Sequence, residues 1–398
     1  WHVAKYFQND GIAFYYIKPQ FHLTFYGFEW VRPWPGDWMY VHFAVMGLAA
    51  LCVLLGCCYR VAAVVLFLTF TQQFLIEKSL YQNHYYLMSL ISFLMIFIPA
   101  HRACSVDALF RPAIESATIP AWTIWLLRVQ LGIVYFYGGL AKLNGDWLRG
   151  WPMRIWLGRH NDFPVLGSYV HEEWCVMFFS YGGLMFDLLI VPMLLWRPTR
   201  IPAVLIALFF HLMNANLFNI GVFPWFMIGA TMIYFSPSWP RTLLHKLLQI
   251  PGKSAAPPTL SKNFSPSRGQ KWTAALLGIY ITLQLLIPFR QFLYPGSAIW
   301  TEEGHFFAWQ MMLREKNVGI RFYAHDPTTG KQGVIGVRPY ISERQMRRLG
   351  KDPEMILDFV HYLHGKMLEL GHEEVEIRVL ALASLNGRKP QLLVDPEV

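Results

Sequence analysis

The chemistry that this sequence suggests centres on a lysine at the end of an apolar stretch. The segment YFYGGLAKLNGDW, residues 135–147, closes an apolar run that begins near Trp122, and it places Lys142 at the end of that run. One interpretation is structural: the long side chain reaches water at a membrane surface, with Asp146 as its ion-pair partner. The other is chemical: a dry, apolar setting favours the neutral amine of a lysine, which can then act as a base. The neighbouring residues leave both interpretations open.

Polar residues also interrupt other apolar runs. Asn83 and His84 stand in EKSLYQNHYYLMS, where an apolar run resumes. His211 and Asn214 stand in FFHLMNANLFNIGVFPWF, and their spacing allows both to share one face of a helix. Polar groups inside a membrane are costly, which makes them candidates for a functional site. The structural alternatives are an interfacial role for His84 and hydrogen bonding between helices for His211 and Asn214.

The composition indicates a polytopic membrane protein. Of 398 residues, 55% are hydrophobic and 15% are charged, whereas soluble domains have about 25% charged residues. We attribute the net charge of +9 to basic loops on one side of a membrane and to lipid contact, because no basic stripe interleaved with aromatic residues indicates nucleic-acid binding. The sequence has no CxxC pair, multi-histidine box, glycine-rich nucleotide loop or GxSxG motif. We therefore expect neither a metal site nor nucleotide or serine-hydrolase chemistry.

The apolar runs predict the fold class. A membrane crossing needs about 20 mostly apolar residues, and we expect seven or eight crossings from the ranges 38–58, 61–76, 85–98, 122–140, 174–195, 201–217, 222–235 and 271–289. The expected fold is a polytopic α-helical membrane domain followed by a mainly β (α+β) soluble domain. The expected boundaries are 1–249 for the transmembrane helical domain, 250–270 for a flexible basic linker, 271–289 for the last transmembrane helix and 290–398 for the soluble domain.

Basic residues predict the orientation of the chain in the membrane. If the spans alternate, one face receives the arginines Arg60, Arg102, Arg111, Arg197 and Arg200. An excess of positive charge marks the cytoplasmic face. Residues 77–84, residues 142–173 and everything after residue 288 then lie on the opposite, non-cytoplasmic side.

The soluble region carries turn and capping signals. Residues 318–337 predict two strands around a turn that contains Asp326 and Gly330. Residues 342–368 predict a helix with Ser342 as its N-cap. Residues 374–398 predict a hairpin around Asn386-Gly387.

Several segments in the same order resemble one protein family over nearly the whole length. They are DWMY (37–40), LGCCYR (55–60), EKSLYQNHYYL (77–87), IVYFYGGLAKLNGDWLRGWPM (133–153), LGRH (157–160), FHLMNANLFNIGVFPWFM (210–227), QLLIPFRQFL (284–293) and FAWQMM (307–312). The chain resembles the vitamin K-dependent γ-glutamyl carboxylases, as a bacterial or otherwise divergent member. The resemblance implies an integral membrane protein of the endoplasmic reticulum or of a bacterial inner membrane, with its active face non-cytoplasmic.

The resemblance also implies a reaction. The expected enzyme is a carboxylase, a carbon-carbon lyase with a quinol monooxygenase half-reaction, which converts peptide glutamate to γ-carboxyglutamate. The expected cofactors are reduced vitamin K (phylloquinol or menaquinol), which is oxidised to its epoxide, together with O2 and CO2, and no metal. A γ-proton beside a carboxylate is too weakly acidic for an ordinary side chain, so a strong base must form out of contact with water.

The family's motifs assign roles to residues of this chain. Lys142 aligns with the family's base, and with this resemblance we favour the chemical interpretation of that lysine. His84 and His211 align with functional histidines, and with Asn83 they complete the expected catalytic set. The expected cofactor-binding residues are Tyr135, Phe223, Trp225 and Asn214, and Arg159 is the expected substrate-binding residue.

The expected partners are a glutamate-containing protein or peptide, with a propeptide that docks on the C-terminal domain, and membrane lipid, but no nucleic acid. The first alternative is a membrane quinol epoxidase, an oxidoreductase without carboxylase activity. The second is a transporter or a membrane-anchored binding protein, for which a broken helix near residues 214–221 is the only sign in the sequence.

Overall fold

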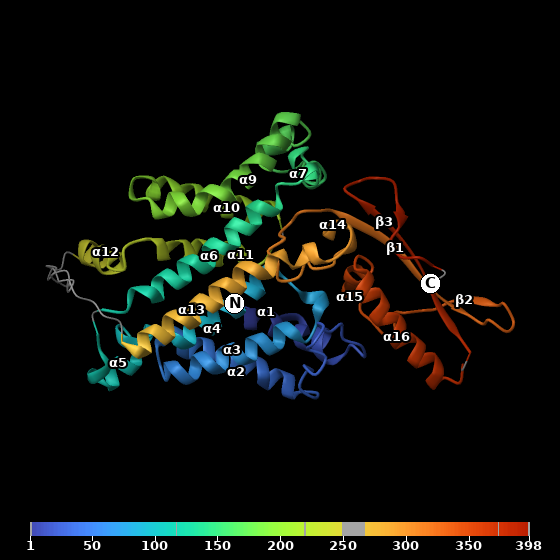
Figure 1. Ribbon diagram of the computed structural model, residues 1–398, viewed down its shortest axis with the longest axis horizontal. Helices are drawn as coiled ribbons and strands as arrows, with labels where there is room; N and C mark the ends of the chain where they lie inside the picture. The colour runs from blue at the N-terminus through green and yellow to red at the C-terminus, as the bar shows by residue number, and fades with distance from the viewer. Residues whose placement is uncertain (1, 117, 219, 249–266, 373, 397–398) are drawn as a thin grey trace. The chain divides into compact units, whose positions relative to one another are not determined.

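The computed structural model describes residues 2–116, 118–218, 220–248, 267–372 and 374–396 (Figure 1). Five ranges among them are long and apolar enough to cross a membrane: α2 (Trp38–Leu55), α6 (Ala121–Ala141), α9 (Glu173–Leu195), Arg197–Leu217, which contains α10 (Arg200–Leu217), and Arg268–Leu293, which contains α13 (Arg268–Leu286). Three shorter apolar helices are α3 (Tyr59–Leu75), α4 (Asn83–Phe97) and Phe223–Tyr234, which begins with α11 (Phe223–Thr231). These eight helices correspond to the eight apolar ranges of the sequence, and the predicted helical membrane domain is confirmed.

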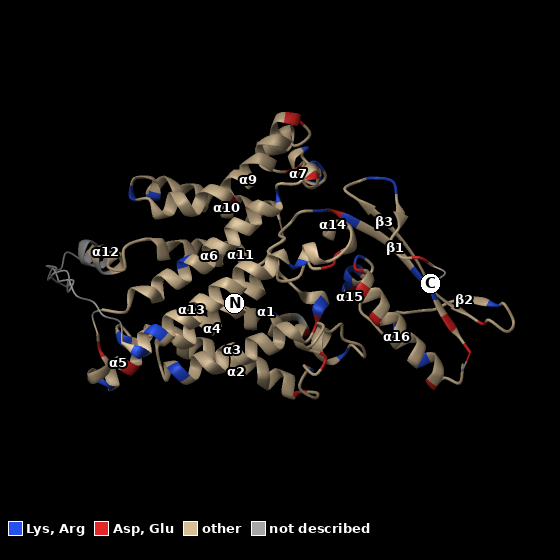
Figure 2. Ribbon diagram, viewed as in Figure 1, with Lys and Arg blue, Asp and Glu red and all other residues tan. Residues whose placement is uncertain are grey.

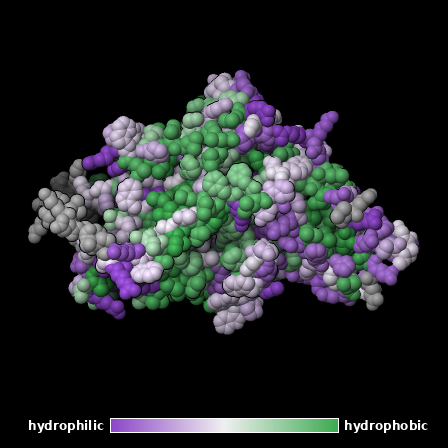
Figure 3. All heavy atoms as spheres, in the orientation of Figure 1, coloured by the Kyte–Doolittle hydropathy of each residue, from purple (hydrophilic) through white to green (hydrophobic). Residues whose placement is uncertain are grey.

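The apolar helices lack the polar face that a water-soluble helix needs. Between Trp38 and Leu55, α2 contains no Lys, Arg, Asp or Glu, and its ribbon is therefore tan in Figure 2. Its side chains Leu48 and Leu54 are 63% and 79% exposed. Many apolar side chains of the helices are exposed in this way, and they colour much of the face in Figure 3 green. Surfaces of this kind are stable in lipid, where apolar exposure carries no penalty.

The turn from α2 to α3 depends on a glycine. Gly56 ends α2 with a φ of 63°, a left-handed conformation that glycine adopts without steric cost. A Cβ at this position would collide with the side chain of Ser105. The backbone carbonyl of Gly56 also accepts a hydrogen bond of 2.9 Å from the N–H of Asp107. The loop after α4 is therefore held against this turn.

The described residues fall into two compact units, and two of the boundaries between these units lie inside α6 and α9. The first unit comprises Trp1–Ile119, Tyr137–Leu184 and Pro288–Val398, and the second comprises Pro120–Phe136 and Met185–Ile287. The first unit thus combines several apolar helices with the soluble domain. Of the predicted linker, residues 250–266 lie outside the described residues, and residues 268–270 form the first turn of α13. The predicted domain boundaries stay a prediction.

The soluble domain contains a four-stranded antiparallel sheet with the strand order β2-β1-β3-β4. The strands are β1 (Lys316–His325), β2 (Gln332–Val334), β3 (Glu376–Leu385) and β4 (Gln391–Leu392). Strand β1 turns into β2 after His325, and β3 turns into β4 through Asn386 and Gly387, so both predicted hairpins are present. The ring centres of Phe322, in β1, and Phe359 lie 5.3 Å apart. This contact packs the helix that contains Phe359 against the sheet.

The helix predicted over 342–368 is two helices. Ser342 caps α15 (Glu343–Leu349) in a capping box with Gln345, as its position predicted. A second helix, α16 (Pro353–Glu369), begins after Asp352, whose side chain accepts hydrogen bonds from the N–H groups of Glu354 and Met355. Pro353 has no N–H group to continue α15, and this explains the break. The shorter helices are α1 (His2–Phe7), α5 (Val106–Phe110), α7 (Gly145–Leu148), α8 (Met153–Leu157), α12 (Trp239–Leu248) and α14 (Ala298–Thr301).

Candidate active site

Lys142 is buried just beyond the end of α6. Lys142 is 7% exposed, and its Nζ donates a hydrogen bond of 3.0 Å to the carbonyl of Gly138, which lies one turn earlier in the helix. The same nitrogen lies 5.3 Å from the centre of the Trp147 ring. The side chain therefore turns back into the protein instead of extending outward. This burial agrees with the chemical interpretation of Lys142, and its role as a base stays a prediction.

The turn that follows Lys142 is anchored to α9. The indole Nε1 of Trp147 donates a hydrogen bond of 2.8 Å to the carbonyl of Ser180, and the hydroxyl of Ser180 donates one of 2.6 Å to the carbonyl of Trp147. Asn144 caps the short helix α7 by accepting from the N–H groups of Asp146 and Trp147. Ser180 was not predicted from the sequence, although a serine inside the apolar run of α9 was an available signal.

Asp146 ties the same turn to the soluble domain. Its Oδ2 accepts a hydrogen bond of 2.8 Å from Asn386, and its Oδ1 forms an ion pair with Arg388, both on the turn between β3 and β4. Burial raises the pKa of Asp146, but the hydrogen bonds from Arg388 and Asn386 outweigh it, and the pKa lies below its ordinary value. Asp146 is thus a carboxylate that holds the soluble domain beside the turn after Lys142.

Asn83 and His84 open α4 and lie in a second contact with the soluble domain. The Asn83 amide donates to the carbonyl of Gln310 at 3.2 Å and accepts from the hydroxyl of Tyr81 at 3.0 Å. His84 is 8% exposed, and its ring centre lies 4.6 Å from that of Tyr85. The structure therefore positions Asn83 firmly, with both ends of its amide engaged, and buries His84 beside it.

Arg159 faces a carboxylate of its own chain. Its guanidinium lies 2.6 Å from Oε1 of Glu315, whose Oε2 accepts a hydrogen bond of 2.8 Å from Trp156. Burial raises the pKa of the Glu315 carboxyl. The hydrogen bonds from Arg159 and Trp156 lower this pKa by more than burial raises it, and the pKa therefore lies below its ordinary value. The Arg159 side chain remains 55% exposed. It is therefore a solvent-accessible guanidinium in a setting that already binds a carboxylate.

The second unit contains a buried tyrosine–histidine pair. The hydroxyl of Tyr135 lies 3.0 Å from Nε2 of His211, which is 1% exposed. Rings of Phe186, Phe210 and Phe223 surround the imidazole at centre-to-centre distances of 5.7, 5.5 and 6.1 Å. Within the described part of the chain, Nδ1 of His211 is buried and has no hydrogen-bond partner. A neutral imidazole that accepts from Tyr135 through Nε2 carries its proton on Nδ1, which is then a donor without an acceptor.

The other predicted cofactor contacts differ in their surroundings. Phe223 lies against His211, as described above. The amide of Asn214 donates to the carbonyl of Phe210 at 2.9 Å, within its own helix. Trp225 is 59% exposed. The structure therefore brings Tyr135, His211 and Phe223 together in the second unit, whereas Lys142, Asn83, His84 and Arg159 belong to the first.

Comparison with protein families covers most of the chain. The HTTM domain matches residues 1–239. The lumenal domain of vitamin K-dependent gamma-carboxylase matches residues 269–398. No solved structure matches the chain. The first match contains Lys142, His84 and His211, and the second contains the sheet that contacts the turn after Lys142.

Proposed function

The chain belongs to the vitamin K-dependent gamma-carboxylase family, and from this premise we propose that it converts peptide glutamate to γ-carboxyglutamate. The proposed reaction couples carboxylation by CO2 to the oxidation of reduced vitamin K by O2. The chain is an integral membrane protein, with five ranges long enough to cross a membrane among the described residues. A lumenal domain implies a non-cytoplasmic active face.

One observation carries this proposal: a buried lysine adjoins a turn that is bonded to the lumenal domain. Lys142 is 7% exposed, and four residues later Asp146 binds Asn386 and Arg388 of the soluble sheet. The candidate base and the domain that the family uses for protein substrates thus belong to one compact unit. A lysine that served only as a membrane anchor would gain nothing from this arrangement, because it needs only access to water.

We assign to Lys142 the removal of a proton from a quinol hydroxyl. The lone pair of Nζ would accept this proton, and the carbonyl of Gly138 at 3.0 Å would orient the Nζ hydrogens. The Trp147 ring at 5.3 Å stabilises the ammonium that forms when the proton arrives. General base catalysis of this kind contributes about 10²–10⁴-fold to a rate. The apolar surroundings also exclude water, which would otherwise quench a strong base.

We assign to the Tyr135–His211 pair the binding of a quinone oxygen. The residues fit such a group: Nδ1 of His211 is buried without a hydrogen-bond partner among the described residues, and aromatic rings surround the imidazole. With Tyr135 donating to Nε2, Nδ1 would carry the proton and would be free to donate. Reduced vitamin K, when bound, supplies with O2 the oxidation energy of the reaction. When the quinone is bound, His211 would donate a hydrogen bond to a quinone oxygen, Tyr135 would fix the imidazole tautomer, and Phe223 would contact the quinone ring. Asn83 and His84 are further proposed hydrogen-bonding groups at the start of α4.

We assign to Arg159 the carboxylate of the substrate glutamate. The side chain is 55% exposed and already holds Glu315 at 2.6 Å, so a substrate carboxylate would take the place of an internal one. The lumenal domain would hold the rest of the protein substrate, with a docked propeptide raising the local concentration of glutamates.

The test measures both products in one reaction. Purified full-length protein is mixed with reduced vitamin K, O2, bicarbonate and a glutamate-containing peptide, and mass spectrometry quantifies the quinone epoxide and the carboxylated peptide. Formation of both products establishes the carboxylase. Epoxide without carboxylated peptide, across peptides with and without a propeptide, would support the alternative of a quinol epoxidase. Neither product from folded protein would reject the proposed chemistry and favour a transporter or binding protein.

A further inference from the structure

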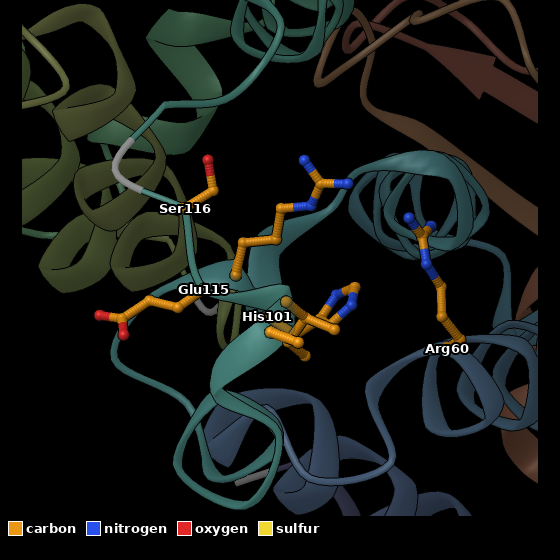
Figure 4. A pocket seen from close by; sticks show the side chains of 7 residues that line it. Arg60, His101, Glu115 and Ser116 are labelled. Carbon is orange, nitrogen blue, oxygen red and sulfur yellow. The ribbon is translucent and has the colours of Figure 1, made fainter.

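A second polar site lies at the other end of α4. A cavity of about 390 Å³ opens between the start of α3 and the loop that follows α4 (Figure 4). It is lined by Arg60, His101, Arg102, Ala113, Ile114, Glu115 and Ser116. None of these residues belongs to the candidate active site. The cavity combines two guanidinium groups with one imidazole, a set of donors that suits an anion.

The nearby carboxylates do not neutralise the two arginines. Both oxygens of Asp107 accept hydrogen bonds from backbone N–H groups, at 2.8 Å from Cys58 and 2.9 Å from Tyr59. Figure 4 shows the carboxylate of Glu115 pointing away from Arg60 and His101. Among the described residues, no ion pair joins Arg60 to an acid. The cavity therefore keeps a net positive charge.

His101 is a fixed donor or acceptor in this cavity. Its ring stacks on Tyr59 at a centre-to-centre distance of 4.9 Å and an interplanar angle of 20°. Tyr59 is itself fixed, because its hydroxyl donates to the carbonyl of Met95 at 2.7 Å. In the part of the chain that the structure describes, the buried Nδ1 of His101 has no partner. Burial and the charges of Arg60 and Arg102 lower the pKa of His101, which leaves a neutral ring for hydrogen bonding at pH 7.

The position of the cavity identifies the membrane face. Helix α4 begins at Asn83, which binds Gln310 of the lumenal domain, and ends at Phe97, just before the cavity. Fifteen helical residues separate the two ends, a length of about 22 Å. The cavity thus lies toward the face opposite the lumenal domain, which is the cytoplasmic face. Cytoplasmic leaflets are rich in anionic lipids.

Apolar side chains next to the cavity are exposed. The short helix α5 lies in the same loop, and its residues Leu109 and Phe110 are 79% and 82% exposed. Asp107 of this helix makes the backbone contacts to Cys58 and Tyr59 described above. Exposed leucine and phenylalanine beside arginines are typical of a segment that inserts into the headgroup boundary of a bilayer. A soluble anion would require the arginines but not this apolar neighbour.

We propose that the Arg60–His101–Arg102 cavity binds the phosphate of an anionic phospholipid headgroup in the cytoplasmic leaflet. Arg60 and Arg102 supply the charge, His101 supplies a hydrogen bond, and Leu109 and Phe110 contact the lipid chains. A phosphate group is the shared chemistry of a lipid headgroup and of free phosphate, and the apolar residues of α5 favour the lipid.

The experiment measures ligand binding to the full-length protein in detergent by isothermal titration calorimetry. The ligands are dioctanoyl phosphatidylglycerol, dioctanoyl phosphatidylcholine and inorganic phosphate. Wild-type protein is expected to bind phosphatidylglycerol about tenfold more tightly than either other ligand. The choline cation of phosphatidylcholine is repelled by the two arginines, and inorganic phosphate has no acyl chain to contact Leu109 and Phe110. Arg102→Gln is expected to remove most of this preference. Arg111→Gln, which removes one exposed arginine from the same loop outside the cavity, is expected to keep it.

Three results would overturn the proposal. Equal affinity for the two lipids in wild-type protein would exclude a headgroup site. Equal weakening by Arg102→Gln and Arg111→Gln would mean a general effect of surface charge. Inorganic phosphate that binds as tightly as phosphatidylglycerol, with the same dependence on Arg102, would mean a soluble phosphate site. If Arg102→Gln fails to fold, Arg60→Gln takes its place and is expected to lose the preference for phosphatidylglycerol in the same way. Arg60→Lys, which keeps the charge, is expected to retain the preference.

Discussion

The hydroxyl of Tyr135 lies 3.0 Å from Nε2 of His211, and the other nitrogen of the same imidazole is buried without a partner among the described residues. When Tyr135 donates to Nε2, the neutral imidazole carries its proton on Nδ1 and presents a donor to an apolar environment. Leaving a buried donor without an acceptor costs about 1–3 kcal/mol. This cost is understandable where a ligand supplies the missing acceptor.

Tyr135→Phe removes the group that fixes the imidazole of His211. We expect kcat/KM for quinol oxidation to fall by about tenfold, which corresponds to about 1.4 kcal/mol of lost interaction. Tyr280→Phe is the matched control, because Tyr280 loses a phenol hydrogen bond to Gln130 in the same unit, outside the proposed site. Steady-state epoxide formation measures both variants. Equal losses in the two would assign Tyr135 a structural role.

Trp147→Phe tests whether the turn after Lys142 positions the lysine. The substitution removes the hydrogen bond of 2.8 Å to the carbonyl of Ser180. It also replaces the indole that lies beneath Nζ of Lys142 with a smaller ring. We expect kcat for epoxide formation to fall by about tenfold with an unchanged KM for quinol, because the misplaced group acts only in the transition state. Trp174→Phe, at a position that is 59% exposed, is the control and should match wild type. A change in KM alone would contradict this role.

Arg159→Gln tests the proposed substrate contact against a purely internal ion pair. If Arg159 binds the substrate carboxylate, the KM for the glutamyl peptide should rise by about tenfold, whereas Glu315→Gln should leave it unchanged or lower it. If the pair with Glu315 is only structural, both variants should lower the thermal stability equally and leave KM unchanged. Arg154→Gln is the control, because Arg154 pairs with Glu173 on the same segment.

Lys316 predicts an unusual dependence of stability on pH. Its side chain is 1% exposed, and burial lowers its pKa from 10.5 to about 7, with Arg314 adding to the effect. Below about pH 7 both folded and unfolded chains carry the proton, so the penalty of the buried charge is fully present. Between about pH 7 and 10.5 only the unfolded chain carries the proton on Lys316. The free energy of unfolding therefore rises by up to about 1.4 kcal/mol per pH unit in this range.

Hydrogen exchange of β1 measures this effect in the full-length protein. After correction for the intrinsic exchange rate, protection should increase between pH 7 and pH 9. Lys316→Met should abolish the contribution, and Lys331→Met, at an exposed position, should retain it. A pH dependence that is identical in wild type and Lys316→Met would show that Lys316 does not titrate in this range.

The sequence predicted those features that depend on local signals. The eight apolar ranges became helices, the turns near Gly330 and Asn386 became hairpins, and Ser342 became an N-cap. Each of these follows from hydrophobic periodicity or backbone chemistry over a few residues. The break at Asp352 was missed although its signal, an aspartate before a proline, is local. The long apolar pattern of the predicted helix concealed it.

Contacts between distant segments were not predictable in this way. Asp146 meets Arg388, and Arg159 meets Glu315, across more than a hundred residues of chain. Many acids and bases are available, and only the folded backbone selects which of them meet. The candidate site was therefore predictable as residue types on the membrane helices, whereas its attachment to the soluble domain required the structure.

The central claim is that Lys142 is the base of a coupled oxidation and carboxylation. The most direct test compares epoxide and carboxylated peptide from wild-type protein, Lys142→Ala, Lys142→Met and a control, Lys18→Ala, which alters an exposed lysine paired with Asp10. We predict that both products fall together by about a hundredfold or more in the two Lys142 variants and persist in the control. Folded Lys142 variants that form both products at the wild-type rate would contradict the account.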